Sequence, residues 1–182
     1  MSPAARLGFL FVPLYFLEQL DLRMTVPEFT IRRATEADAR GILDCLAAAF
    51  EAYRSSYTRD AYSDTVLTPE TLSQRLTTMQ VFIAFSPSEG IVGTIACAIA
   101  GEGEGHLRGM AVLPEFQGRG IAESLLKTAE AALVQQGCSR VTLDATEPLL
   151  RAMRFYEKHG YGQSGKVIDF FGMPLHEFVK QL

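Results

Sequence analysis

The sequence contains no asparagine, which excludes N-glycosylation because the acceptor motif requires that residue. Cysteine is scarce, and no Cys-x-x-Cys pair occurs, so the cysteines are predicted to be reduced core residues of a cytoplasmic protein rather than disulfides or metal ligands. Histidine is equally scarce, and its spacing is not that of a metal site. The residues concerned are Cys45, Cys97, Cys138, His106, His159 and His176.

An apolar run long enough to span a bilayer, about 20 residues, is also missing from the first part of the chain. The run at residues 7–17 is shorter, and it lacks the small-x-small cleavage site of a signal peptide. We expect residues 1–24 to be an appended segment, produced by an upstream start or folded as a helix against the domain or a partner subunit. A membrane anchor is the less favoured interpretation. Met24 would be the alternative start.

Positive charge shows no excess either. The formal net charge is −4, and no basic stripe offsets it, which argues against nucleic-acid binding. The chain has 182 residues, of which 48% are hydrophobic and 21% are charged. These values predict a globular protein with one domain, over residues 25–182, and a core that needs no disulfides. A homodimer is left open.

Hydrophobic periodicity predicts a mixed α/β domain with three layers. Helices are indicated by apolar residues every three to four positions, and strands by alternation or short apolar runs. The order is strand, two helices, three strands, helix, strand, helix, two strands. Expected strands are 29–34, 81–85, 91–100, 106–112, 140–145, 166–171 and 173–179; expected helices begin near 36, 69, 122 and 146.

The most informative stretch is a glycine loop, residues 117–122, which joins the strand at 106–112 to a helix. The first N–H groups of a helix have no internal partner, and small residues before them leave room for a pyrophosphate. An ordinary turn that needs glycine would look similar. A dinucleotide fingerprint fails because Glu123 stands where a small residue is required, and no Walker phosphate loop occurs. A nucleophile elbow, Gly-x-Ser-x-Gly, is also missing.

The pattern that fits is Gln/Arg-x-x-Gly-x-Gly/Ala, formed by Gln117, Gly120 and Ala122. With this loop the sequence resembles the GNAT superfamily of acyl-CoA-dependent N-acetyltransferases. Residues 110–115 resemble the strand end that leads into the family's loop, and residues 152–161 resemble its Ala-x-x-hydrophobic-Tyr-x-Lys-x-Gly-aromatic segment. The resemblance runs from Phe29 to the C-terminus. One departure is Leu149, where the family often has asparagine.

The resemblance implies a mostly antiparallel sheet flanked by helices, and acetyl-CoA as the acyl donor with no metal. It also implies that the amine nitrogen attacks the thioester directly. The strand near Met110 would supply a backbone N–H to the oxyanion and pair with the pantetheine arm. The residues expected to contact the coenzyme are Met110, Ala111, Val112, Gln117, Gly118, Arg119, Gly120, Ile121 and Ala122.

The reaction needs a base and an acid. An alkylamine with a pKa of about 10.4 is neutral in only about 1 in 2,500 molecules at neutral pH, and the leaving thiolate must gain a proton. Tyr156 matches the family's usual acid, although a tyrosine there can also simply pack the helix on the sheet. The resemblance implies a base early in the central strand, where His106 and Glu104 are the candidates. Both can equally be solvated turn residues.

The tyrosine-rich connection after the first helix is a candidate acceptor pocket for a cation, or a solvated acidic loop beside core aromatics. Its residues are Tyr53, Tyr57, Tyr62, Asp60 and Asp64. The sequence therefore predicts a cytoplasmic N-acetyltransferase for a small primary amine. The alternatives are a protein or peptide N-acetyltransferase and a non-catalytic acyl-CoA-binding sensor.

Overall fold

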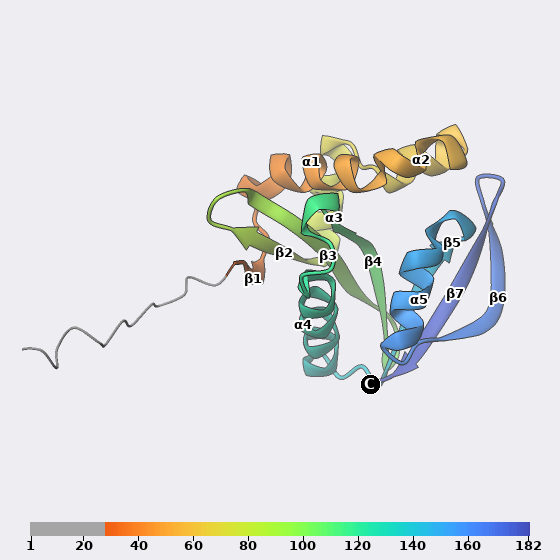
Figure 1. The fold of residues 1–182 in the computed structure, drawn as a ribbon. Helices are drawn as coiled ribbons and strands as arrows, with labels where there is room; N and C mark the ends of the chain where they lie inside the picture. Colours follow the sequence, from red (N-terminus) through yellow and green to blue (C-terminus); the bar gives the residue numbers. More distant parts are fainter. Residues whose placement is uncertain (1–27) are drawn as a thin grey trace, which may run out of the picture.

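The computed structural model describes residues 28–182. The predicted appended segment, residues 1–24, lies outside this range. The described chain forms one seven-stranded sheet with the order β1-β2-β3-β4-β5-β7-β6 (Figure 1). All neighbouring strands are antiparallel except β4 and β5. The strands are β1 (Thr30–Arg33), β2 (Gln80–Ser86), β3 (Gly90–Gly101), β4 (Glu104–Val112), β5 (Arg140–Thr146), β6 (Gly162–Phe170) and β7 (Met173–Gln181).

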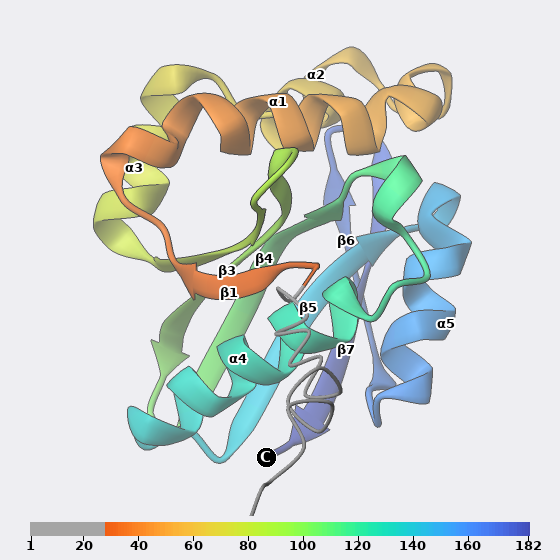
Figure 2. The ribbon, with the colours of Figure 1, turned by 60° about the vertical axis from the view of Figure 1, so that its left-hand side comes forward.

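Helices cover both faces of the sheet, so the predicted three-layer α/β fold is confirmed (Figure 2). The helices are α1 (Ala39–Phe50), α2 (Arg59–Thr65), α3 (Pro69–Thr78), α4 (Ile121–Gln135) and α5 (Leu150–Lys158). Strand β2 shows how the alternating sequence builds two cores. Val81 and Ile83 pack with α1 and α3 on one face, whereas Ala84 packs with α4 on the other.

Short-range signals set the helix starts. The Thr68 side chain accepts a hydrogen bond from the Thr71 amide, and Pro69 occupies the first turn of α3, where a missing N–H costs nothing. Before α1, a capping box joins Thr35 and Asp38. Arg32 donates two hydrogen bonds to the Asp38 carboxylate, at 2.7 and 2.8 Å, which ties β1 to the start of this helix.

Two elements differ from the sequence-based expectation. The tyrosine-rich connection contains the short helix α2, whose N-cap is Thr58. Its seven residues give too little periodicity to be recognised, and its packing partner Met173 is distant in sequence. Strand β6 begins at Gly162 instead of residue 166, because its pairing with β7 continues through a register shift between Gln163 and Val167.

The feature that positions the site is the parting of β4 and β5. The two parallel strands pair only from Glu104–Arg140 to Leu107–Leu143. Beyond that point β4 stays paired with β3, and β5 stays paired with β7. The C-terminal halves of β4 and β5 therefore diverge, and the sheet opens between them.

Candidate active site

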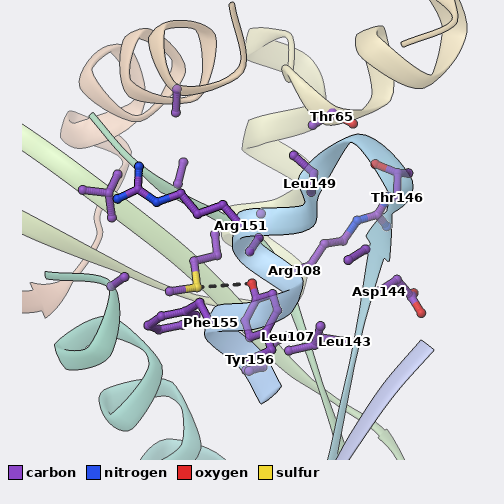
Figure 3. A pocket seen from close by; sticks show the side chains of 18 of the residues that line it. Thr65, Leu107, Arg108, Leu143, Asp144, Thr146, Leu149, Arg151, Phe155 and Tyr156 are labelled. Atoms are coloured by element: carbon purple, nitrogen blue, oxygen red, sulfur yellow. Dashed lines mark hydrogen bonds between the residues drawn. The ribbon is translucent and has the colours of Figure 1, made fainter. Parts of the chain in front are cut away.

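A cavity of about 760 Å³ lies where β4 and β5 diverge, and residues from both faces of the sheet line it (Figure 3). One end reaches the glycine loop and the start of α4. The other end reaches α1, α3 and the β6–β7 hairpin. The opening between the strands thus joins two halves of one cavity, with side chains of α5 beside the passage.

Tyr156 of α5 lines the cavity beside the opening between β4 and β5, which we call the passage. Its hydroxyl lies 3.3 Å from the sulfur of Met110 on β4, as the dashed line in Figure 3 marks. The ring packs against those of Tyr161 and Phe178, with centroids 5.7 and 6.5 Å away. Burial raises the pKa of the Tyr156 phenol well above its ordinary value. The hydroxyl therefore keeps its proton at neutral pH and is available as a donor.

A β-bulge shapes the same part of β4. Thr94 pairs with Ala111 and Ala96 with Arg108, so two residues of β4 stand opposite one residue of β3. The bulge contains Gly109, whose φ of +63° lies in the left-handed region that favours glycine. A bulge leaves its extra residue out of the regular ladder. Backbone groups beside Met110 can thus face the cavity instead of the neighbouring strand.

The glycine loop forms the end of the cavity near α4, a helix of 15 residues. Gly118 and Gly120 have φ values of +82° and +80°, and a Cβ added to either would meet no atom within 4 Å. The loop backbone is therefore open to a ligand at a helix N-terminus, the arrangement that binds phosphate groups. The Gln117 side chain links the loop to its surroundings: it donates to the Val112 carbonyl and accepts from Arg151 at 2.7 Å.

Most of the predicted coenzyme contacts line the cavity; their roles remain predictions. The lining ones are Met110, Ala111, Val112, Gln117, Gly118, Gly120 and Ala122. Two others do not line it. Ile121 is 1% exposed and packs in the core. The Arg119 guanidinium lies over the Phe116 ring and forms an ion pair with Glu28.

Of the two predicted bases, the structure brings only His106 to the cavity. Its Nδ1 lies 3.0 Å from Thr142 Oγ1, and its Nε2 lies 3.7 Å from the Asp144 carboxylate. Burial lowers the pKa of His106, with the Asp144 carboxylate opposing that effect. Glu104 instead forms an ion pair with Arg140 at 3.0 Å and does not line the cavity.

The half of the cavity away from the glycine loop includes part of the predicted tyrosine cluster. Tyr53, Tyr57 and Asp64 line it, whereas Tyr62 and Asp60 do not. The Tyr57 hydroxyl lies 2.6 Å from Thr146 Oγ1, which connects the first helical layer to the end of β5. Asp64 accepts a hydrogen bond from Arg108 at 2.6 Å.

Sequence reasoning missed several lining residues, among them Asp144, Arg75 and Arg108. Asp144 lies two residues after Thr142 on β5 and so shares its face, which could be inferred from the sequence. Its partner His106 could not, because the β4–β5 register is not written locally. Within residues 28–182 no three His, Cys, Asp or Glu side chains gather in a way that could hold a metal ion. No helix in the same range is long and apolar enough to cross a membrane.

Comparison with known proteins identifies the family. The model of the acetyltransferase (GNAT) family matches residues 43–161. The chain belongs to the GNAT family of acetyltransferases. A curated relative is the N-alpha-acetyltransferase MAK3 of Arabidopsis thaliana, 29% identical over 93 residues, which cover 50% of this chain and 48% of the relative. This GNAT chain therefore matches about half the length of that relative.

Solved structures share the fold. The PaiA N-acetyltransferase of Thermoplasma acidophilum, solved in complex with coenzyme A, has a TM-score of 0.70 and 19% identity, covering 85% of this chain and 99% of that one. The ribosomal-protein-alanine N-acetyltransferase of Brucella melitensis has a TM-score of 0.66 and 20% identity, covering 84% and 99%. At these identities the likeness establishes the fold of this GNAT chain and not its acceptor.

Proposed function

We propose that this GNAT chain transfers an acetyl group from acetyl-CoA to the primary amine of a small molecule. The observation that carries the proposal is the single cavity that runs between the parted strands. One end offers an open backbone loop at a helix start, and the other end offers His106, with Tyr156 between them. A donor and an acceptor can therefore enter from opposite faces of the sheet and meet at the passage.

The loop fits the diphosphate of coenzyme A. Glycine at positions 118 and 120 leaves the backbone uncovered, and the α4 dipole adds partial positive charge. The edge of β4 at residues 110–112 faces the cavity and can pair with the pantetheine arm as an added strand would. The coenzyme supplies an activated thioester. The complex of the Thermoplasma acidophilum relative with coenzyme A supports this assignment.

The chain's own residues supply the proton transfers. His106, kept neutral by burial, accepts a proton from the amine as nitrogen attacks the carbonyl carbon. Asp144 faces the imidazole and stabilises its protonated form. Tyr156 donates its proton to the departing sulfur, a step for which a buried, protonated phenol is suited. A backbone N–H of the bulge beside Met110 donates to the oxygen that gains charge.

A small acceptor is supported by the way the acceptor end is enclosed. The β6–β7 hairpin reaches α2, as Figure 1 shows. Thr58 holds it there: its hydroxyl donates to the Phe171 carbonyl at 2.9 Å, and its amide contacts the Met173 sulfur at 3.4 Å. Met173 also packs with Tyr57 and Ala61. These contacts hold the hairpin against α2, and hairpin residues Ile168, Phe170 and Leu175 line the cavity, which limits the size of what fits there.

The test is coenzyme A release from acetyl-CoA across a library of small amines, with acetyl-CoA binding measured separately by calorimetry. We expect binding and acetyl-CoA-dependent turnover with a subset of amines. His106→Ala and Tyr156→Phe are expected to lower turnover strongly while retaining binding. Full turnover in both variants would show that the assigned roles are wrong, and no affinity for the coenzyme in folded protein would refute the proposal.

A second candidate is acetylation of a protein or peptide N-terminus, which the similarity to an N-alpha-acetyltransferase favours. It predicts activity on peptides and none on free polyamines, amino acids or aminoglycosides. A non-catalytic sensor would bind acetyl-CoA tightly and transfer nothing to any amine. Leu149 in place of the family's asparagine leaves room for it, while Tyr156 at the passage argues for catalysis.

A further inference from the structure

We propose that the amine acceptor carries a carboxylate close to its nitrogen, and that Arg75 of α3 binds that carboxylate. This inference rests on the proposed acetyl transfer and narrows the acceptor to amines that also carry a carboxylate. Two sources of the carboxylate share this chemistry: the α-carboxylate of a free amino acid, and an acidic side chain near a peptide N-terminus.

Arg75 is an unpaired charge in the acceptor half of the cavity. Its guanidinium makes no hydrogen bond or ion pair within residues 28–182, and the residue is partly buried at the cavity wall. Burial lowers the pKa of Arg75 to about 10, with repulsion from Arg108 adding to the effect and Asp64 opposing it. A charged group in such a place costs free energy unless an anion pairs with it. The cavity therefore contains a cation that a bound anionic ligand could neutralise.

The free nitrogens of Arg75 face open space. Within the described part of the chain, no fully enclosed side-chain nitrogen or oxygen lacks a hydrogen-bond partner. The unbonded guanidinium nitrogens are therefore accessible to solvent, and Arg75 is one of the residues that line the cavity. The other two arginines of the lining are already engaged: Arg108 with Asp64 at 2.6 Å, and Arg151 with Gln117 at 2.7 Å.

The position of Arg75 places the carboxylate near the reacting amine. Its Nη1 lies directly over Gly109, where a Cβ of any other residue would collide with it. Gly109 belongs to the bulge next to Met110, whose sulfur contacts the Tyr156 hydroxyl. The guanidinium is thus within a few atoms of the passage where transfer would occur. A carboxylate bound there must be separated from the amine by a short linker, as in an α- or β-amino acid.

The charges on the two sides of the site match a zwitterion. Asp144 and His106 provide the side that receives an ammonium and removes its proton, while Arg75 provides the side that receives a carboxylate. A planar guanidinium binds a carboxylate through two parallel hydrogen bonds, which also orients the amine. The nearby positive charge further lowers the pKa of the bound amine and so favours its neutral, nucleophilic form.

The experiment compares matched acceptors that differ only in the carboxylate. Coenzyme A release is measured with free L-amino acids, their α-carboxamides and the corresponding decarboxylated amines. A peptide arm with an acidic or a neutral second residue separates the two sources of the carboxylate. We expect acceptors with the carboxylate to exceed their matched neutral forms in kcat/KM by about 10-fold or more.

Arg75→Gln should raise KM for these acceptors by about 10- to 100-fold and leave KM for the carboxamides unchanged. Arg75→Lys should restore part of the preference, since it keeps the charge without the planar fork. The control is Arg40→Gln, because Arg40 is exposed on α1, pairs with Asp44 on the same helix and does not line the cavity. This control should change neither class of acceptor.

Equal use of the acids and their neutral counterparts would overturn the inference. An Arg75→Gln variant that lowers kcat on both classes by the same factor would also overturn it, and would place Arg75 at the oxyanion or in the scaffold. If acetyl-CoA binds but no amine is acetylated, the proposed function fails by itself. Calorimetry of N-acetyl-L-amino acids and their amides with the coenzyme A-loaded protein then tests Arg75 directly: binding of the acids alone, lost in Arg75→Gln, supports the inference, and no such preference refutes it.

Discussion

Replacing Tyr156 with phenylalanine removes one hydroxyl from the passage and leaves its ring in place. General acid–base catalysis contributes about 10²- to 10⁴-fold to a rate, so losing the proton donor should lower kcat by about 100-fold or more. That factor corresponds to about 3 kcal/mol of lost transition-state stabilisation. The folded state should be little affected. Among the described residues the hydroxyl hydrogen-bonds only to a weak sulfur acceptor, at 3.3 Å, so the free energy of unfolding should change by less than about 1 kcal/mol.

The assay is coenzyme A release under saturating acetyl-CoA, together with urea unfolding and calorimetric binding of acetyl-CoA. Tyr161→Phe is the matched control, since it removes a neighbouring buried hydroxyl outside the cavity. The Tyr161 hydroxyl donates to Glu130 at 2.8 Å, so its loss should cost about 1–3 kcal/mol of stability and leave kcat unchanged. A Tyr156→Phe protein with undiminished kcat, or one whose kcat falls no more than that of the control, would refute the assignment.

Three further predictions concern the base, the loop and the first helix. Because burial lowers the pKa of His106, kcat/KM should rise with pH along a limb centred below the ordinary value of about 6.5, and His106→Gln should abolish that limb in a pH–rate profile. Gly120→Ala, at φ +80°, should cost about 1–2 kcal/mol of stability and weaken acetyl-CoA binding about 10-fold by calorimetry. Gly90→Ala, at φ +79° in the first residue of β3, should cost the same stability and leave binding intact. Arg32 holds the pKa of Asp38 below its ordinary value, so this carboxylate stabilises the fold above pH of about 3.9 and loses that effect as pH falls. Asp38→Asn should therefore cost about 1 kcal/mol at neutral pH, a modest value because Arg32 is partly exposed, and should flatten the acid limb of a urea-unfolding series.

The sequence by itself determined the features that depend on neighbours along the chain. The alternation and periodicity of apolar residues predicted the strands, four of the helices and the three layers. The loop at 117–122 could be predicted to be a ligand-binding turn because its glycines, the strand before it and the helix after it are contiguous. Tyr156 could be selected because the segment around it matches a family motif.

The tertiary structure decided what depends on register between distant strands. From the sequence alone, Glu104 and His106 are equally good candidates for the base. The β4–β5 pairing places His106 against Thr142 and Asp144, whereas Glu104 forms an ion pair with Arg140. The divergence of the same two strands creates the cavity, and no local pattern encodes where a parallel pair stops pairing.

The position of Arg75 in the cavity also could not be predicted from the sequence. In the sequence it is one polar residue on an amphipathic helix, indistinguishable from a solvated arginine. Its significance comes from Gly109, which lies far away in the chain and is brought beneath it by the packing of α3 on the sheet. A site formed by one contiguous segment can be predicted from the sequence, because interactions between neighbouring residues determine its conformation. Chemistry that needs side chains from several elements exists only once the sheet order and the packing bring them together.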